Sequence, residues 1–278
     1  MAHVFEPALA RALARDIRLA ALQMVHAARA SHIGGALSMA DVLGVLYGGW
    51  LRVDPARPDD PARDRFILSK GHACTALYAA LALRGFFPRA WLDGYARDGS
   101  LLMSHVSHHV PGVEFSTGSL GHGLPFAVGK ALAANVRREG WRTVALLSDG
   151  ELDEGSNWEA LLFAGHHRLS GLTAVVDCNG IQSLGRVEET LSLEPLAAKL
   201  EAFGWEALEV DGHDVEALHQ ALSASRTGRP RAIVARTVKG KGVSFMEDRL
   251  EWHYKSPDAA QLAAARAELG GDDAHRLS

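Results

Sequence analysis

Two short loops of this chain carry oxygen ligands where a metal ion and a phosphate could bind together. Asp149 follows an apolar run at residues 143–147, and Asn179 follows a second run at residues 172–176. Carboxylate, amide and backbone oxygens are the ligands that Mg²⁺ and Ca²⁺ prefer, and phosphate often completes the coordination shell. Gly150 would let a phosphate approach the backbone at the amino end of the next helix. A metal-bridged diphosphate therefore fits these residues, although Asp-Gly after a strand is equally an ordinary turn.

The elements that must position these oxygens form a strand–helix–strand unit. Residues 143–147 and 172–176 are short β-type runs, and residues 154–169 between them have the length and apolar spacing of a helix. Parallel strands joined by a helix place both following loops at the same edge of a sheet, where open α/β sheets bind ligands. The unit therefore predicts that Asp149 and Asn179 lie near each other.

Alternating strands and helices continue along the rest of the chain. Helices are expected over residues 8–30, 38–47, 73–84, 124–138, 191–203 and 214–224 and from residue 258 onward, and further strands over 66–68, 206–210 and 231–236. The paired glycines Gly34 and Gly35 are expected to break the first helix. This alternation predicts an α/β fold with a doubly wound, mainly parallel sheet flanked by helices.

Length and composition favour an ordinary globular protein. The 278 residues could form one large α/β domain or two small ones, and 47% hydrophobic with 22% charged residues is typical of a chain with a sizeable core. The net charge of −4 gives no electrostatic reason to expect nucleic acid or an anionic membrane. Since no long apolar run and no signal-like start are present, we expect a cytoplasmic protein.

Fourteen histidines are the compositional exception, and several lie in Gly-rich segments. His32 stands in such a segment, and His72 follows a short strand within Lys70-Gly71-His72, where a phosphate could bind. Taken alone, a histidine in a Gly-rich break is more often a solvated loop residue. The nearby imidazoles between residues 105 and 109 lack a cysteine or carboxylate at helical spacing, so they make a poor zinc site.

Several motifs together resemble one enzyme family. Ser148-Asp149-Gly150 and then Asn179, about thirty residues later, resemble the thiamine-diphosphate motif, which usually has Gly in place of Ser148. The segment at residues 154–160 resembles the transketolase version of this motif. The resemblance to transketolases extends over about residues 10–256 and also includes Lys70-Gly71-His72 and Trp252-His253.

The resemblance implies a cofactor, a metal ion and a set of site residues. The cofactor would be thiamine diphosphate, and the implied ligands of a Mg²⁺ or Ca²⁺ ion are Asp149, Asn179 and the carbonyl of Ile181. The implied cofactor-binding residues are Lys70, His72, Gly118, Leu120, Gly150, Glu154, Asn179 and His253. The implied catalytic residues are His32, His72, His105 and His253, since imidazoles are suited to moving protons near neutral pH.

Four further positions allow a structural interpretation or differ from the family pattern. Glu154 and Glu159 match acidic residues at the dimer interface of the family, although without the resemblance they are equally charges favoured at a helix amino terminus. Tyr254 stands where the family commonly has Gly, so the substrate entrance is expected to differ. We interpret His213, in the turn after a predicted strand, as structural.

The resemblance covers the diphosphate-binding half of a full-length transketolase. It implies one diphosphate-binding domain over residues 1–278, with a short polar carboxy-terminal tail and without the pyrimidine-binding domain. The expected function is transfer of a two-carbon ketol unit from a ketose or ketose phosphate to an aldose or other aldehyde. Activity is expected only with a separate carboxy-terminal subunit, in an α2β2 heterotetramer, and neither nucleic acid nor a membrane is an expected partner.

Two other functions remain open at this point. One is a subunit of a related thiamine-dependent two-carbon transferase or of a 2-oxo-acid dehydrogenase, against which the Lys70-Gly71-His72 and Trp252-His253 motifs favour a transketolase. The other is a non-catalytic interaction module. The intact metal ligands and histidines argue against that module, because a protein without catalysis has no need of them.

Overall fold

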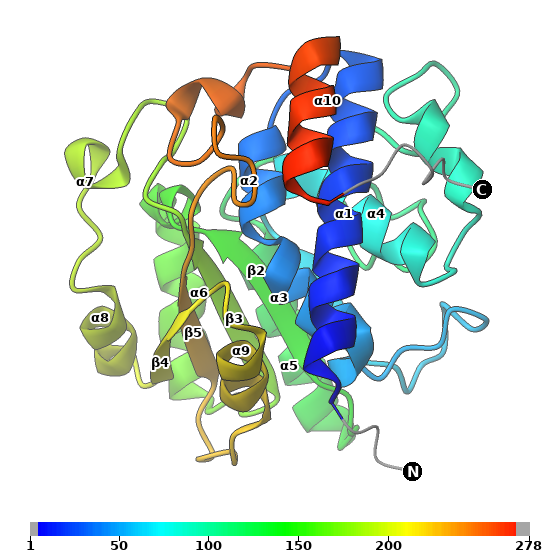
Figure 1. Ribbon diagram of the computed structural model, residues 1–278. Coiled ribbons are helices and arrows are strands. Elements are labelled where there is room, and N and C mark those ends of the chain that lie inside the picture. Colours follow the sequence, from blue (N-terminus) through cyan, green and yellow to red (C-terminus); the bar gives the residue numbers. More distant parts are fainter. Residues whose placement is uncertain (1–4, 271–278) are drawn as a thin grey trace.

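A parallel sheet forms the centre of the computed structural model, which describes residues 5–270 (Figure 1). Its strands are β1 (Arg65–Leu68), β2 (Thr143–Ser148), β3 (Leu172–Cys178), β4 (Glu206–Asp211) and β5 (Arg231–Arg236). They lie in the order β1-β2-β3-β5-β4, and each neighbouring pair is parallel. The predicted α/β fold with a mainly parallel sheet is confirmed.

Helices cover both faces of the sheet, because successive side chains of each strand point to opposite sides. On β3, Val175 packs into one core, whereas Ala174 and Val176 pack into the other. The helices of the first core are α1 (Pro7–Ala28), α2 (Ile33–Ser38), α3 (Ala40–Val45), α4 (Cys74–Leu83), α9 (Val215–Ser223) and α10 (Ala259–Glu268). Those of the second core are α5 (Gly123–Arg137), α6 (Gly155–His166), α7 (Val187–Thr190) and α8 (Leu196–Ala202).

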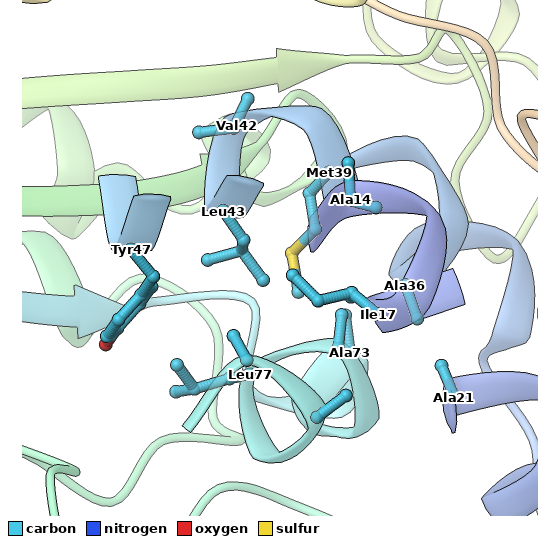
Figure 2. Close-up of a cluster of buried hydrophobic side chains, with 14 of the residues drawn as sticks. Ala14, Ile17, Ala21, Ala36, Met39, Val42, Leu43, Tyr47, Ala73 and Leu77 are labelled. Atoms are coloured by element: carbon cyan, nitrogen blue, oxygen red, sulfur yellow. The ribbon is translucent and has the colours of Figure 1, made fainter. Parts of the chain in front are cut away.

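Helix α1 organises the first core. It contacts α3 and α4, and α10 lies along it (Figure 1). Figure 2 shows part of this core, where Ala14 and Ile17 of α1 meet Leu43 of α3 and Leu77 of α4. Burial of these apolar side chains stabilises the layer of helices on this face of the sheet.

The path of the chain puts the carboxyl ends of β1, β2, β3 and β5 next to one another. The chain moves in one direction from β1 through β2 and β3, passes to β4 at the edge, and returns to β5 between β3 and β4. Helices α5, α6 and α8 precede β2, β3 and β4 on one face, and α9 precedes β5 on the other. Right-handed crossovers require this change of face when the direction reverses.

Short helical turns complete the framework. They are η1 (Leu46–Trp50), η2 (Gly71–Ala73), η3 (Arg89–Gly94), η4 (Gly150–Asp153) and η5 (Leu250–His253). Among residues 5–270, no helix combines the length and the apolarity that crossing a membrane requires.

The expectation that Gly34 and Gly35 break the first helix is wrong. Both glycines lie inside α2, and the break falls earlier, where Arg29 and His32 have φ of 50° and 72°. The glycines serve close packing instead, since a Cβ on Gly34 would lie 3.0 Å from Cγ of Lys239. Small residues here let α2 approach the loop that follows β5.

The predicted helix over residues 191–203 begins later than expected. The backbone is extended at Leu191, and α8 starts only after Pro195. Proline suits this position because it lacks the N–H that a first helical turn leaves unpaired. The helix expected from residue 258 is α10, whereas the polar tail after residue 270 lies outside the described residues.

Two helical glycines offer a matched test of packing. Ala at Gly165 of α6 would place its Cβ against the backbone carbonyl oxygen of Phe203, whereas the Cβ position of Gly129 in α5 has no atom within 4 Å. We expect Gly165→Ala to lower the free energy of unfolding by about 2–3 kcal/mol, because a backbone carbonyl cannot move aside freely. Gly129→Ala should raise it by about 0.5–1 kcal/mol. Urea unfolding of both variants measures this, and equal stability would contradict the packing described.

Candidate functional site

The candidate site lies where four neighbouring strands end. Lys70 follows β1, Asp149 follows β2, Asn179 follows β3 and Lys239 follows β5. The loops that carry Asp149 and Asn179 lie next to each other, as predicted, since the N–H of Gly180 donates to Oδ2 of Asp149 at 2.6 Å. The carboxyl ends of parallel strands all lie at one end of the sheet. In this chain that end brings together acidic, amide and lysine side chains.

Asp149 is a buried carboxylate held by backbone donors. Its Oδ1 accepts the N–H of Gly150 at 2.8 Å, and its Oδ2 accepts that of Gly180. Burial and the nearby Asp177 carboxylate raise the pKa of Asp149 to about 6. A bound cation would favour the ionised form of this carboxylate, so the surroundings of Asp149 suit a metal ligand.

The other two predicted metal ligands lie in the loop after β3. Asn179 turns its Oδ1 back to the N–H of Ile181 at 3.2 Å, and its Nδ2 lies 3.3 Å from the Asp177 carboxylate. The carbonyl of Ile181 accepts a hydrogen bond from Nζ of Lys239 at 2.8 Å. Within residues 5–270, His, Cys, Asp and Glu nowhere gather in threes to hold a metal. A metal ion here would therefore need these amide and carbonyl oxygens.

Lys70 and Asp177 form a buried ion pair beside these oxygens. Their side chains are 1% and 0% exposed, and Nζ of Lys70 also donates to the carbonyl of Gly35 at 3.1 Å. Asp177 further accepts the hydroxyls of Ser38, at 2.5 Å, and of Thr237. Burial alone would raise the pKa of Asp177, but Lys70 and the two hydroxyls outweigh it, so the pKa lies below its ordinary value.

Lys239 and Asp177 are functional candidates that the sequence analysis missed. Nζ of Lys239 lies 3.0 Å from Nδ1 of His253, in addition to its bond to Ile181. Burial and the neighbouring Lys70 lower the pKa of Lys239 to about 8. Two features of the sequence could have indicated these residues. Lys239 is a lysine in a Gly-rich loop after a predicted strand, and Asp177 is an acidic residue at the end of an otherwise apolar strand.

The four predicted catalytic histidines come together although they belong to separate segments. The ring centroid of His32 lies 5.1 Å from those of His72 and His253 and 6.0 Å from that of His105, and His72 lies 5.7 Å from His253. The backbone fixes one of these pairs, since the N–H of His32 donates to the carbonyl of His253 at 2.8 Å. The arrangement provides several imidazoles around one space.

The local environment keeps these imidazoles neutral. Burial, with His105 and Lys239 nearby, lowers the pKa of His32 to about 4, and burial with Lys239 and His32 lowers that of His253 to about 3. Burial and Lys70 lower the pKa of His72 well below its ordinary value, and burial lowers that of His105. At neutral pH each ring can therefore accept a proton at one nitrogen and donate a hydrogen bond from the other.

The loop before α5 approaches the histidines on one side. A Cβ on Gly118 would lie 3.0 Å from Cδ2 of His105, so the loop packs closely against that ring. Leu120 is half-buried in the same loop. Contacts of Gly118 and Leu120 with a cofactor stay predictions.

Two glutamates near the start of α6 differ in their surroundings. Glu154 is exposed beside Gly121, so its predicted role at a cofactor stays a prediction. Glu151, which the sequence analysis did not single out, is fully buried and accepts the Ser69 hydroxyl at 2.5 Å and the N–H of Gly121 at 3.0 Å. Glu151 therefore joins the loops after β1 and before α5 to the loop after β2.

Comparison with known proteins shows a consistent similarity. Residues 9–277 match the family model described as "Transketolase, thiamine diphosphate binding domain". The chain is 41% identical to an apulose-4-phosphate transketolase subunit of Phocaeicola vulgatus, over 89% of each chain. It is 42% identical to the 6-deoxy-6-sulfo-D-fructose transketolase subunit SqwG of Clostridium sp., over 92% of this chain and 94% of that one.

The fold comparison agrees with the sequence comparison. The crystal structure of transketolase from Campylobacter jejuni superimposes with a TM-score of 0.91 at 31% identity. The match covers 96% of this chain but only 44% of the Campylobacter chain. This chain therefore spans less than half the length of that transketolase.

The buried ion pair gives a first test of the site. Lys70→Met removes the ammonium and leaves the Asp177 carboxylate buried without its cation. We expect a loss of about 3–5 kcal/mol in the free energy of unfolding. The double variant Lys70→Met with Asp177→Leu should lose less than Lys70→Met alone, since no charge is then buried unpaired. Chemical denaturation measures the free energy of unfolding of both variants. A double variant less stable than Lys70→Met alone would contradict the description of Lys70 and Asp177 as a buried ion pair.

The neutral histidines predict how stability depends on pH. Their pKa values are lower in the folded chain than the value of about 6.5 expected when unfolded. The unfolded chain therefore binds more protons at these histidines below about pH 6.5, so their contribution to the free energy of unfolding should fall as the pH falls from about 6.5 to 4. His253→Asn should make this decline shallower, whereas His166→Asn on the exposed face of α6 serves as control. Equal slopes in both variants, measured by urea unfolding across this range, would count against a buried neutral cluster.

Proposed function

This chain belongs to the transketolase family, and from that premise we propose that it is the thiamine-diphosphate-binding, N-terminal subunit of a transketolase whose other half is a separate chain. Relatives named as transketolase subunits match it over 89% and 94% of their own length. The names of these relatives support a divided transketolase over a 2-oxo-acid dehydrogenase subunit or a non-catalytic module.

One observation carries the proposal: four adjacent strand ends bring two buried lysines to the same place as three candidate metal-ligating oxygens. Thiamine diphosphate would need cations near its phosphates, and a divalent ion bound with it would take oxygen ligands. Asp149, Asn179 and the Ile181 carbonyl have that chemistry. A divalent ion on the Ile181 carbonyl would compete with Lys239, whose ammonium could then pair with a diphosphate oxygen. We propose Mg²⁺ as this ion, and Ca²⁺ accepts the same oxygen set.

The histidines would handle the protons of the reaction. When bound, thiamine diphosphate supplies stabilisation of a carbanion at a former carbonyl carbon, which permits cleavage and formation of carbon–carbon bonds. His32, His72, His105 and His253 would hydrogen-bond the hydroxyl and carbonyl oxygens of an open-chain sugar. As neutral rings they can take a proton from a hydroxyl and return one to an oxyanion.

The printed names of two relatives suggest a substrate class. One contains a ketose phosphate and the other a ketose with a sulfo group. We propose that a ketose with an anionic end group donates the two-carbon ketol unit, and that an aldose or other aldehyde accepts it. We further propose an α2β2 assembly in which a separate carboxy-terminal subunit completes each site.

Co-expression with a carboxy-terminal transketolase subunit from the same source tests this proposal. The purified complex should bind thiamine diphosphate only with a divalent ion and should transfer ketol units, whereas the chain alone should be inactive. Asp149→Asn in the complex should weaken Mg²⁺-dependent cofactor binding by at least about 100-fold, because a charged metal ligand is lost. Asp98→Asn, the same substitution at an exposed carboxylate in the turn that follows η3, is the matched control. Full turnover by the chain alone, or unchanged binding by Asp149→Asn, would overturn the proposal.

A further inference from the structure

We propose that His213 is a positioning residue that holds the Lys239 loop over the cofactor site, through a hydrogen-bonded chain that begins at Arg18 and Asp41. The inference rests on the proposed function. It assigns a role to residues of α1, α3 and the loop after β4, which lie outside the group of residues that would contact the cofactor.

His213 makes one hydrogen bond with each ring nitrogen. Nδ1 lies 2.8 Å from Oδ2 of Asp41, and Nε2 lies 2.8 Å from the backbone nitrogen of Val238. Since the Val238 nitrogen can only donate, Nε2 must be the acceptor. The ring therefore carries its proton on Nδ1, which donates to Asp41. This tautomer is fixed on both sides, as in sites where a carboxylate orients a histidine.

Asp41 is itself held in place by a bidentate ion pair. The two terminal nitrogens of Arg18 lie 3.1 and 2.5 Å from the Asp41 oxygens, and Nε of Arg18 donates to the carbonyl of Leu37 at 3.2 Å. The side chains of Arg18 and Asp41 are each 9% exposed. Burial would raise the pKa of Asp41, but His213 and Arg18 outweigh it and the pKa lies below its ordinary value. The carboxylate therefore stays ionised and keeps the His213 ring in one orientation.

The loop that carries His213 fits closely against the end of β5. A Cβ on Gly212 would overlap the side-chain methyl group of Thr237, and the N–H of Gly212 donates to the carbonyl of Arg236 at 2.7 Å. Glycine is needed here because a side chain at this position would collide with the Thr237 methyl group. This close approach brings the neighbouring His213 within reach of Val238.

The contact at Val238 acts directly on the site, because Val238 immediately precedes Lys239. The ammonium of Lys239 touches the Ile181 carbonyl and His253, which are a predicted metal ligand and a predicted catalytic residue. A rotation of the Val238 peptide would move the Lys239 backbone and with it that ammonium. His213 therefore fixes where the second buried lysine meets the cofactor.

Two substitutions separate this role from a merely structural one. In His213→Gln the amide group takes roughly the position of Nε2, so its oxygen can accept the N–H of Val238. In His213→Asn the amide lies near the position of Nδ1, so it can donate to Asp41 but does not reach Val238. The two variants keep opposite halves of the same contact.

The first measurement uses the full chain without cofactor and needs no activity. Hydrogen–deuterium exchange of the peptide covering residues 237–242 should be about tenfold faster in His213→Asn than in wild type, and nearly unchanged in His213→Gln. The second measures thiamine diphosphate binding with Mg²⁺ by the complex with the carboxy-terminal subunit. The dissociation constant should rise about tenfold in His213→Asn and less than about threefold in His213→Gln, as expected for one buried donor left unpaired.

The outcomes distinguish the two proposals. If wild type binds no thiamine diphosphate, the proposed function fails. The exchange experiment then still tests whether His213 positions the loop that carries Lys239. If wild type binds and both variants match it in exchange and affinity, His213 does not position the loop. If both variants are impaired equally, the effect is general loss of packing, and the positioning role is overturned.

Discussion

The buried ion pair between Lys70 and Asp177 is the interaction on which the site depends. A charge pair without access to water stabilises a protein only when its remaining hydrogen-bonding positions are filled, and here Ser38, Thr237 and the Gly35 carbonyl fill them. The partners belong to α2 and to the segment after β5, and the pair itself joins the segment after β1 to the end of β3. The pair therefore fixes the relative positions of the loops that carry the functional side chains.

The charges around this pair are compatible with the anionic cofactor and the divalent ion that we propose for the site. Lys239 is a second buried cation, and the pKa of Asp149 is raised to about 6 by burial and by Asp177. Burial, together with the nearby lysines, keeps the surrounding imidazoles unprotonated. A diphosphate would compensate Lys239, since Lys70 is already paired with Asp177, and a divalent ion would compensate Asp149. In the chain without a bound cofactor the histidines are neutral, and we propose that they exchange protons with the sugar substrate.

Local patterns and motifs predicted much of the fold and part of the site. The apolar runs ending at Asp149 and Asn179 are strands, and parallel pairing brings their loops together, as the strand–helix–strand pattern predicts. The four histidines that the resemblance to transketolases implies as catalytic lie close together, and their catalytic roles stay predictions. The burial of Lys239 and the packing of Gly34 within α2 were not predictable, because both depend on contacts between segments about 200 residues apart. Local glycine propensity alone predicted a helix break at Gly34, and tertiary packing overrides it.

A crystal structure of the chain with its carboxy-terminal subunit, grown with thiamine diphosphate and Mn²⁺ in place of Mg²⁺, would show where the cofactor and the metal ion bind. We expect an anomalous peak for Mn²⁺ among the oxygens of Asp149, Asn179 and Ile181, with the cofactor diphosphate beside Lys239. Density for the cofactor at another place, or a metal ion bound without these three oxygens, would show that the proposed site is wrong.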